Sequence, residues 1–351
     1  MRTLGQYLID ALAACGVRYV FGIPGVHNLE LYRGLAQSSI RHVNGRHEQG
    51  LGFMADGYAR VSGRPGVCFT ITGPGLTNIL TAMGQAYGDS IPLLVISSQN
   101  ARGEGDRGCG FLHELPRQRE MAAGLSAAAF SIGDPAELPG ALERAFDIFA
   151  AARPRPVYIE IPLDVLGMQA GDLPLPNPTA RPPQPPLGSI DSAVAFLRAA
   201  RRPVMIVGGG GVRAVPEVKR MAELLDAPVV MTANARGVLA PDHPLAVPMS
   251  PMLAPVRSLI ADAAHPHRYR SGTTDSRRDT GCWVMWRRAG HFDGVGIRRA
   301  GWRSLRRGRG ACGNDSHGSP GGGRRVLDVV AATHRLVESH PRYVARRGVR
   351  G

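Results

Sequence analysis

The sequence predicts an α/β protein with a parallel sheet, followed by a smaller α/β unit and an irregular basic tail. Short, nearly continuous apolar segments alternate with helical segments through the first 165 residues. Strands that are apolar on both sides belong to parallel sheets that helices cover on both faces. Residues 174–186 hold seven prolines in thirteen positions, which indicates an extended, semi-rigid linker before the second unit. The net charge then changes abruptly after Asp262.

The elements of the first unit follow helical and strand periodicity in turn. Leu4, Leu8, Ile9 and Leu12 form a helical stripe, and Gly16 ends it. The remaining expected elements are strands at 19–23, 40–43, 67–72, 92–97 and 157–161, and helices at 28–37, 48–61, 75–87 and 135–152.

The second unit repeats this rhythm after the prolines. The expected elements are a helix at 192–200, a strand at 204–207, a glycine turn at 208–211, a helix at 215–225 and a strand at 228–231. The rhythm stops near Ala261, too early for a complete domain of this type. The predicted division of the chain is therefore a first domain at 1–167, a linker at 168–189, a partial domain at 190–262 and a tail at 263–351.

Composition places the chain among soluble, cytoplasmic proteins. The apolar content of 44 % is typical of a globular domain. The five cysteines form no CxxC pair, which predicts reduced thiols. No apolar run approaches the roughly 18 to 20 residues that span a bilayer. Asp10 interrupts the first apolar segment, so we expect no signal peptide and no membrane partner.

The tail carries nearly all of the net charge. Residues up to Asp262 include 23 basic and 22 acidic side chains, and later residues 19 and 6, so +13 of the formal +14 lies in the tail. Its arginine pairs follow neither helical nor strand spacing, and we expect it to be disordered. The charge predicts non-specific attraction to polyanions but no specific nucleic-acid partner.

Five ordered motifs carry a family resemblance. They are GIPG (22–25), RHEQGLGFMADGYARVSG (46–63), TGPGLTN (72–78), DSIPLLVISS (89–98) and PVYIEIPLDV (156–165). Together they resemble thiamine-diphosphate-dependent enzymes of the acetolactate synthase and 2-oxo-acid decarboxylase group. The resemblance implies a pyrimidine-binding domain at 1–167 and an incomplete, Rossmann-like central domain at 190–262. The resemblance implies either a carboxy-lyase or an acetolactate synthase-like transferase as the activity of the intact family.

The resemblance assigns a catalytic role to Glu48. In this family the carboxylate at that position hydrogen-bonds the aminopyrimidine ring of thiamine diphosphate and so favours loss of a proton from the cofactor's reactive carbon. Taken alone, Glu48 is also a residue that the helix macrodipole favours at a helix start.

Two glycine-rich turns complete the expected cofactor site. Gly22, Pro24 and Gly25 follow the first strand, and a backbone without Cβ lets a ligand approach closely. A second turn lies at the carboxyl end of another strand, the edge at which open parallel sheets bind ligands. Its cofactor-binding residues are Gly73, Pro74, Gly75 and Asn78. Ordinary strand-to-helix turns remain the alternative for both.

Substrate residues are expected at His27, His113 and Glu114. The segments GIPGVHNLELYRGL and HELPRQ resemble the corresponding sequences of 5-guanidino-2-oxopentanoate (2-ketoarginine) decarboxylases. Glu114 could hold a guanidinium group through two hydrogen bonds. Acetolactate synthases usually carry a glutamine where this chain has His113, and this departure argues against acetolactate chemistry. Exposed loop residues without a substrate role remain the alternative.

Flavin and magnesium are not expected to bind. The glycine run 207–212 departs from the GxGxxG pattern, so we interpret it as a structural turn and consider FAD unlikely. The family binds Mg²⁺ through a GDG motif and a later asparagine in a third domain. GACGNDSHG (310–318) lacks that order, and Gly321–Gly323 has the composition of a flexible linker.

We therefore expect a truncated family member. Lys219 is the only lysine among 42 basic residues, which implies a GC-rich gene, and such reading frames become rich in arginine and glycine when shifted by one base. We hypothesise a frameshift near Ala263, which the nucleotide sequence would decide. Without the diphosphate-binding domain, the chain alone is expected to be inactive on 2-oxo acids. Expected partners are a second copy or a full-length paralogue, the latter giving a non-catalytic binding role.

Overall fold

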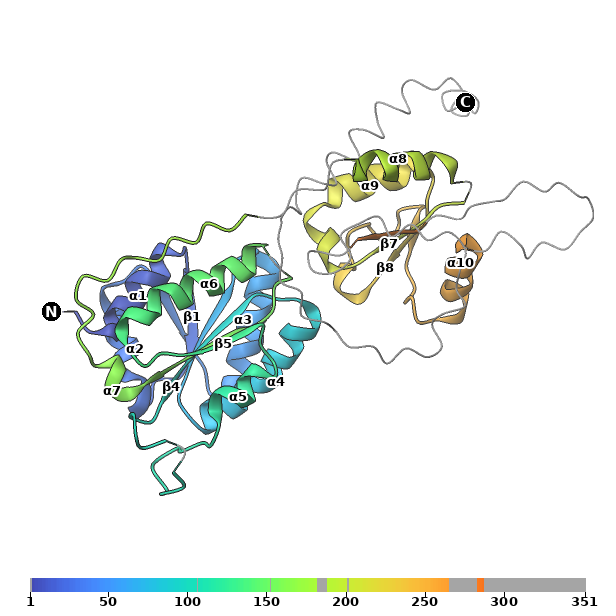
Figure 1. Cartoon of the computed structure of the whole chain (residues 1–351). Helices are drawn as coiled ribbons and strands as arrows, with labels where there is room; N and C mark the ends of the chain where they lie inside the picture. The colour runs from blue at the N-terminus through green and yellow to red at the C-terminus, as the bar shows by residue number, and fades with distance from the viewer. Residues whose placement is uncertain are drawn as a thin grey trace, which may run out of the picture. The chain divides into compact units, whose positions relative to one another are not determined.

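The computed structural model describes residues 2–264, except 106, 152, 182–187 and 201, together with the short strand Trp283–Trp286. The chain divides into two compact units, Met1–Arg181 and Pro182–Gly351 (Figure 1). Each unit is an α/β structure and is described by itself.

The first unit contains a six-stranded parallel sheet in the order β2-β1-β3-β4-β6-β5. The strands are β1 (Tyr19–Gly22), β2 (Arg41–Asn44), β3 (Gly66–Thr70), β4 (Leu93–Gln99), β5 (Ala128–Ser131) and β6 (Val157–Pro162). The parallel sheet predicted from the sequence is confirmed. Because β2 and β3 lie on opposite sides of β1, the strand order reverses at β1.

Helices cover both faces of this sheet (Figure 1). They are α1 (Leu4–Ala14), α2 (Leu29–Arg33), α3 (Glu48–Ser62), α4 (Pro74–Asp89), α5 (Gln118–Ala123), α6 (Leu138–Ala151) and α7 (Leu163–Leu166). Successive residues of a strand point to opposite faces. Accordingly, Leu94 and Ile96 of β4 pack in the core with α1 and α6, whereas Leu93 and Val95 pack in the core with α3 and α4.

Local signals fix the ends of the helices. Thr3 caps α1, and its N–H and side chain form a capping box with Gln6. Gly16 follows that helix with φ 80°, a left-handed conformation that glycine adopts without a steric cost. α3 likewise ends at Gly63, with φ 71°.

Some elements differ from the sequence-based expectation. The helix expected at 28–37 is divided into the 3-10 turn Val26–Asn28, the short helix α2 and a second 3-10 turn, Leu35–Gln37. Helix α5 and strand β5 were not expected. β5 is a partly exposed edge strand with the sequence AAFS, which has too few large apolar side chains to give a strand signal.

Much of the expected linker is fastened to the first unit. The amide of Leu4 donates to the carbonyl of Met168 at 2.8 Å, and the Tyr7 hydroxyl donates to the carbonyl of Pro174 at 2.6 Å. Farther along, the amide of Asn177 donates to Glu143 of α6 at 2.9 Å. The compact unit therefore extends to Arg181, beyond the expected domain end at 167.

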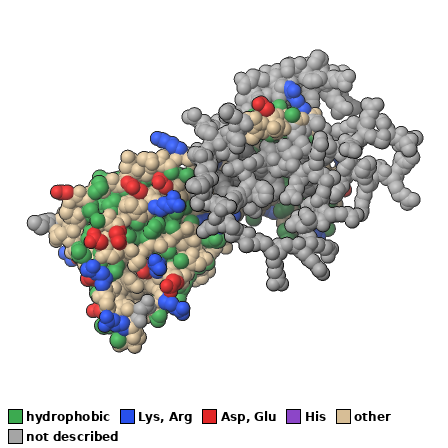
Figure 2. All heavy atoms as spheres, viewed as in Figure 1, with side chains coloured by type: hydrophobic (Ala, Val, Ile, Leu, Met, Phe, Trp, Pro, Cys, Tyr) green, Lys and Arg blue, Asp and Glu red, His purple; other side chains and the backbone are tan. Residues whose placement is uncertain are grey.

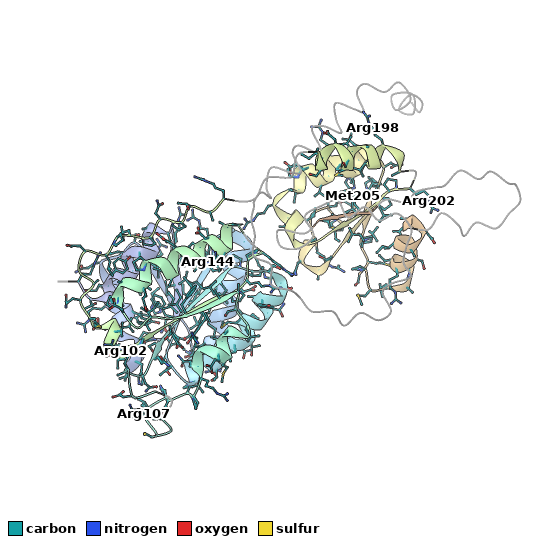
Figure 3. All side chains as sticks on the ribbon, in the orientation of Figure 1. Arg102, Arg107, Arg144, Arg198, Arg202 and Met205 are labelled. Carbon is teal, nitrogen blue, oxygen red and sulfur yellow. The ribbon has the colours of Figure 1, made fainter. Side chains whose placement is uncertain are left out.

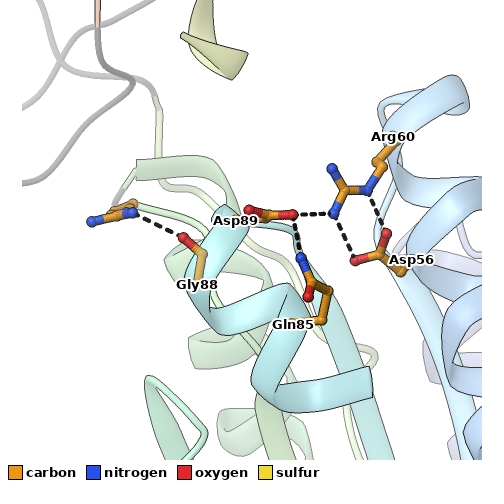
Figure 4. A network of polar contacts seen from close by, with 6 residues as sticks. Asp56, Arg60, Gln85, Gly88 and Asp89 are labelled. Carbon is orange, nitrogen blue, oxygen red and sulfur yellow. Dashed lines mark hydrogen bonds and ion pairs between the residues drawn. The ribbon is translucent and has the colours of Figure 1, made fainter. Parts of the chain in front are cut away.

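A charged network joins the carboxyl-terminal halves of α3 and α4 (Figure 4). The guanidinium of Arg60 binds Asp56 one turn earlier in α3 and donates to Asp89 of α4 at 2.7 Å. Gln85 donates to the same oxygen of Asp89 at 2.7 Å. Asp56 is only 5 % exposed, so the ion pair compensates a buried charge.

The second unit has a four-stranded parallel sheet in the order β10-β7-β8-β9. Its elements are α8 (Ser189–Ala199), β7 (Val204–Val207), α9 (Val215–Leu225), β8 (Val229–Met231), β9 (Ala246–Val247), α10 (Ala254–Ala264) and β10 (Trp283–Trp286). α8 and α9 cover one face and α10 the other. Figure 3 shows the buried Met205 of β7 inside the unit and the exposed Arg198 on α8.

Four residues of the basic tail form β10, whose backbone pairs with β7. The other tail residues after Ala264, for which disorder and a frameshift were expected, lie outside the described part of the chain. Figure 2 shows acidic and basic side chains interspersed over the visible face of the first unit. Among the described helices, none combines the length and apolar character that crossing a membrane requires.

Candidate functional site

The candidate site lies at the carboxyl end of β1 and β3, where the strand order reverses. The two strands pair directly, Phe21 opposite Cys68 and Gly22 opposite Phe69. Neighbouring strands whose connections leave in opposite directions open a crevice beyond their carboxyl ends, and open α/β sheets bind ligands there. Both glycine-rich turns predicted from the sequence follow these two strands.

The turn after β1 is shaped by close backbone approach. A Cβ on Gly22 would lie 2.6 Å from the carbonyl oxygen of Phe69, so only glycine fits at this position. Asn28 is fully buried, and its side chain accepts a hydrogen bond from the amide of Gly25 at 2.7 Å. Pro24, between Gly22 and Gly25, is exposed. The buried asparagine therefore fixes a turn whose outer surface stays open.

The turn after β3 is equally tight. Gly73 has φ 67°, and a Cβ there would lie 2.6 Å from the carbonyl oxygen of His113. Pro74 is the first residue of α4, a position at which its missing N–H has no helical partner. A Cβ on Gly75 would lie 2.7 Å from Cγ1 of Ile71. The turn therefore presents bare backbone at the start of a helix.

Glu48 lies beside the turn after β3 and the first turns of α4. It is the first residue of α3, and the His47 side chain caps that helix by accepting from the amide of Gln49 at 3.2 Å. The Glu48 side chain is 9 % exposed, and its Oε2 accepts from Nδ2 of Asn78 at 2.9 Å. Its Oε1 lies 3.6 Å from the place that a Cβ on Gly75 would take. The structure thus brings three of the predicted cofactor residues together.

His27 and His113 face each other from two loops. Their ring centroids lie 5.5 Å apart. The Nδ1 atom of each ring is buried and has no hydrogen-bond partner among the described residues. Burial lowers the pKa of His27, and the nearby His113 lowers it further, while Glu104 opposes the shift. A pair of buried nitrogens without partners is suited to receive polar atoms of a ligand.

Glu114 has a different environment. Its two carboxylate oxygens accept four backbone N–H groups of its own loop, at 2.7–3.3 Å. The donors are Arg107, Gly108, Gly110 and Phe111. Desolvation raises the pKa of Glu114, but these hydrogen bonds outweigh it and hold the pKa below its ordinary value.

Gln118 is a site residue that the sequence analysis did not single out. Its side chain is 1 % exposed, and Oε1 accepts from the Thr72 hydroxyl at 2.8 Å and from the Gly73 amide at 3.1 Å. Its Nε2 donates to the Ser98 carbonyl at 3.2 Å and to the Tyr158 hydroxyl at 2.9 Å. One buried amide therefore ties the turn after β3 to β4 and β6.

Glu160 extends this buried network. It is 3 % exposed, and one oxygen accepts from Tyr158 at 3.2 Å. Burial raises the pKa of Glu160, although hydrogen bonds from Ser131, Tyr158 and Gln118 oppose the rise. Tyr158 likewise has a pKa well above its ordinary value, because of burial and the nearby Glu160.

The glycine turn of the second unit forms the 3-10 turn Gly209–Arg213 after β7. A Cβ on Gly209 would lie 3.2 Å from Cβ of Asn234, so the turn packs closely on the segment after β8. The segments 310–318 and 321–323, from which no metal or phosphate site was expected, lie outside the described residues.

Comparison with known proteins agrees with this architecture. Residues 2–121 match the family "Thiamine pyrophosphate enzyme, N-terminal TPP binding domain", and residues 190–264 match "Thiamine pyrophosphate enzyme, central domain". The chain is 50 % identical over 263 residues to a probable 2-ketoarginine decarboxylase, AruI, of Pseudomonas aeruginosa, which covers 74 % of this chain and 47 % of that protein.

Two acetolactate synthases are also similar. The isozyme 1 large subunit of Escherichia coli is 37 % identical over 250 residues, 70 % of this chain and 44 % of that protein. A probable chloroplastic acetolactate synthase 2 of Oryza sativa subsp. japonica is 37 % identical over 249 residues, 69 % and 37 % of the two chains. This chain spans less than half the length of these relatives. The two matched domains and these identities show that the chain belongs to the family of thiamine pyrophosphate enzymes.

Proposed function

We propose that the first unit binds the pyrimidine half of thiamine diphosphate and that Glu48 is its catalytic carboxylate. The observation that carries the proposal is the buried Glu48 at the start of α3, hydrogen-bonded to Asn78 and facing the bare backbone of Gly75. Both glycine turns lie at the reversal of strand order, where α/β sheets accept ligands.

The residues present fit the pyrimidine half of this cofactor. A carboxylate that is mostly buried can accept a hydrogen bond from a ring nitrogen or amino group with little competition from water. Asn78 orients the carboxylate by donating to Oε2, which leaves Oε1 on the Gly75 side. When bound, the cofactor supplies a carbanion that adds to the carbonyl group of a 2-oxo acid. The chain's own part is to hold the ring and position Glu48.

The proposed substrate is 5-guanidino-2-oxopentanoate, with decarboxylation as the reaction. The 50 % identity to a probable 2-ketoarginine decarboxylase supports this choice. His27 and His113 supply polar nitrogens close to both glycine turns, and we assign them to the 2-oxo acid. The acetolactate synthases, at 37 % identity, support carboligation as the second candidate.

We further propose that the chain needs a partner for activity, either a second copy or a full-length paralogue. Apolar side chains on α3 are exposed, with Phe53 at 40 %, Met54 at 44 % and Val61 at 92 %. This exposure on the helix that carries Glu48 supports a protein partner beside the site.

Calorimetric titration with thiamine diphosphate, and with thiamine to isolate the part without phosphates, tests the cofactor role. Glu48→Gln and Asn78→Leu are expected to weaken binding at least about tenfold, because a hydrogen bond to a charged group contributes about 1.5–3 kcal/mol. Glu120→Gln, an exposed change on α5, is the matched control. Binding that is unchanged in Glu48→Gln would refute the assignment.

The same preparation, assayed for CO₂ release, tests the partner requirement. With thiamine diphosphate and Mg²⁺, the chain alone is expected to release no CO₂ from 5-guanidino-2-oxopentanoate or pyruvate. Activity of the isolated chain would contradict this expectation. Preference for pyruvate after a full-length subunit is added would favour the acetolactate synthase alternative, and co-purification without any activity would favour a non-catalytic role.

A further inference from the structure

We propose that Glu114 is a positioning residue, which fastens the loop 107–114 and thereby holds His113 against His27 and the turn after β3. The inference deepens the proposed function and depends on it only for the assignment of the histidine pair to the substrate. It gives Glu114 a role in shaping the site rather than in touching the substrate's guanidinium group.

The first observation is the way in which the carboxylate is engaged. Oε1 accepts from the amides of Arg107 and Gly108 at 2.8 and 2.7 Å, and Oε2 from those of Gly110 and Phe111 at 2.9 and 3.3 Å. Four convergent amides form an anion-binding concavity of the kind that backbone nests make for phosphates. Here the anion belongs to the loop itself, so the carboxylate closes the loop on its own backbone.

The second observation is the backbone conformation of this loop. Gly108 and Gly110 have φ of 65° and 77°, and His113, which carries a Cβ, has φ 57°. A left-handed conformation is costly for a residue other than glycine and persists only where surrounding contacts impose it. The neighbouring Glu114 supplies such contacts, because its side chain and the amide of residue 114, which donates to the Phe111 carbonyl at 2.9 Å, lock both ends of this turn.

The third observation is what the loop places at the site. The carbonyl of His113 accepts from the Thr72 hydroxyl at 3.2 Å and occupies the space that a side chain on Gly73 would need. The ring of the same residue faces His27 at 5.5 Å. Movement of the loop would therefore change the histidine pair and the support of the glycine turn together.

The hydrogen bonds that Glu114 already accepts favour the same conclusion. Arg107, labelled in Figure 3, contributes its backbone amide to Glu114. A guanidinium group from a substrate would have to compete with four amides for oxygens that already accept two hydrogen bonds each.

Hydrogen exchange on the full-length chain tests the fastening. In Glu114→Ala, the amides of residues 107, 108, 110 and 111 are expected to exchange at least about tenfold faster, since each loses a charge-assisted hydrogen bond. Glu114→Gln keeps one acceptor oxygen and is expected to retain protection at one pair of amides. Glu120→Gln is the control. Unchanged exchange in Glu114→Ala would overturn the proposal.

A titration of the His27 ring, followed by NMR, separates positioning from a merely local effect. If Glu114 holds His113 in place, the pKa of His27 rises toward its ordinary value in Glu114→Ala and returns in part in Glu114→Gln. An unshifted His27 would show that the loop does not position the pair. Neither measurement needs a cofactor, so failed thiamine diphosphate binding would refute the proposed function and leave this result standing.

A direct role for Glu114 predicts a different outcome. Addition of 5-guanidino-2-oxopentanoate to the wild-type chain would then release the four amides, with faster exchange at 107–111 and a shift of the Glu114 carboxyl resonance. This outcome would overturn the positioning role. Unchanged or slower exchange of these amides supports it.

Discussion

The distance between Glu48 and Asn78 depends on how closely α3 approaches α4, and one glycine sets that approach. A Cβ on Gly52 would lie 2.6 Å from Cβ of Ala82 and 2.8 Å from Cγ1 of Ile79, both on α4. Cβ of Ala82 is fixed to its backbone, so it cannot move away unless α4 moves with it. A Cβ added to Gly57, one turn and a half later in α3, would have no neighbouring atom within 4 Å. The two glycines therefore form a matched pair on one helix.

Replacing each by alanine separates two effects. Both substitutions gain about 0.5–1 kcal/mol from helix propensity. Only Gly52→Ala adds the overpacking cost, which is about 1–3 kcal/mol for an extra methyl group in a filled core. We therefore expect Gly57→Ala to stabilise the first unit, and Gly52→Ala to be about 1–3 kcal/mol less stable than Gly57→Ala. Because Glu48 lies one turn before Gly52, cofactor binding should weaken in Gly52→Ala alone.

Hydrogen exchange of β3 and β4 amides measures this difference, because their opening free energy reports the first unit separately from the second. Thiamine diphosphate titration of both variants supplies the second readout. Equal stabilities would show that α3 moves away from α4 at no cost. Weakened stability with unchanged cofactor binding would show that helix packing does not set the position of Glu48.

Two further predictions concern charged groups in the first unit. Arg60→Met removes the ion pair of the nearly buried Asp56 and should destabilise the unit by about 1–2 kcal/mol, a value discounted for the 32 % exposure of Arg60. Urea unfolding measures the loss, and we expect stability to recover when Asp56→Leu is added. Glu160→Gln tests a buried carboxyl whose pKa is raised by burial. The folded unit holds that proton more tightly than the unfolded chain does. The protonated carboxyl therefore contributes its full stabilisation below about pH 4.5, and this stabilisation is lost as the pH rises through the folded pKa. Unfolding free energies measured from pH 4 to 8 should fall less steeply in Glu160→Gln, and parallel curves for the two proteins would contradict the assigned shift.

The elements that the sequence predicted correctly are those in which buried apolar residues recur at strand or helix spacing. β4 is buried along both faces, and α4 buries Leu76, Ile79 and Met83 at helical spacing, so periodicity alone identifies both. The helix expected at 28–37 does not form as one element, because the side chain of the fully buried Asn28 hydrogen-bonds the backbone of Ile23 and Gly25 in the turn before α2. An asparagine that bonds local backbone competes with helix formation, and no apolar pattern reports this.

The site was predictable only where it depends on chain order. Glu48 and the two glycine turns follow strands of a parallel sheet, so their meeting at one edge follows from topology. The segment 111–118 was expected near the substrate, but Gln118 was not singled out within it, because a buried amide in a polar segment gives no apolar signal and its partners come from distant strands. The four amides around Glu114 depend on left-handed residues of a loop, whose backbone the residue types alone do not determine.

The site is better regarded as one end of the α3–α4 interface than as a set of loops. The two helices run from the same sheet edge, and their facing residues advance together by four: Glu48 with Asn78, then Gly52 with Ala82. The far end of the interface is fixed by Arg60 and Asp89 (Figure 4). All three contacts join the same two helices, so a change in the separation of α3 and α4 at a later contact is expected to alter the separation of Glu48 and Asn78 as well. We therefore expect the steric contact at Gly52 and the ion pair of Arg60 both to influence where the oxygens of Glu48 lie.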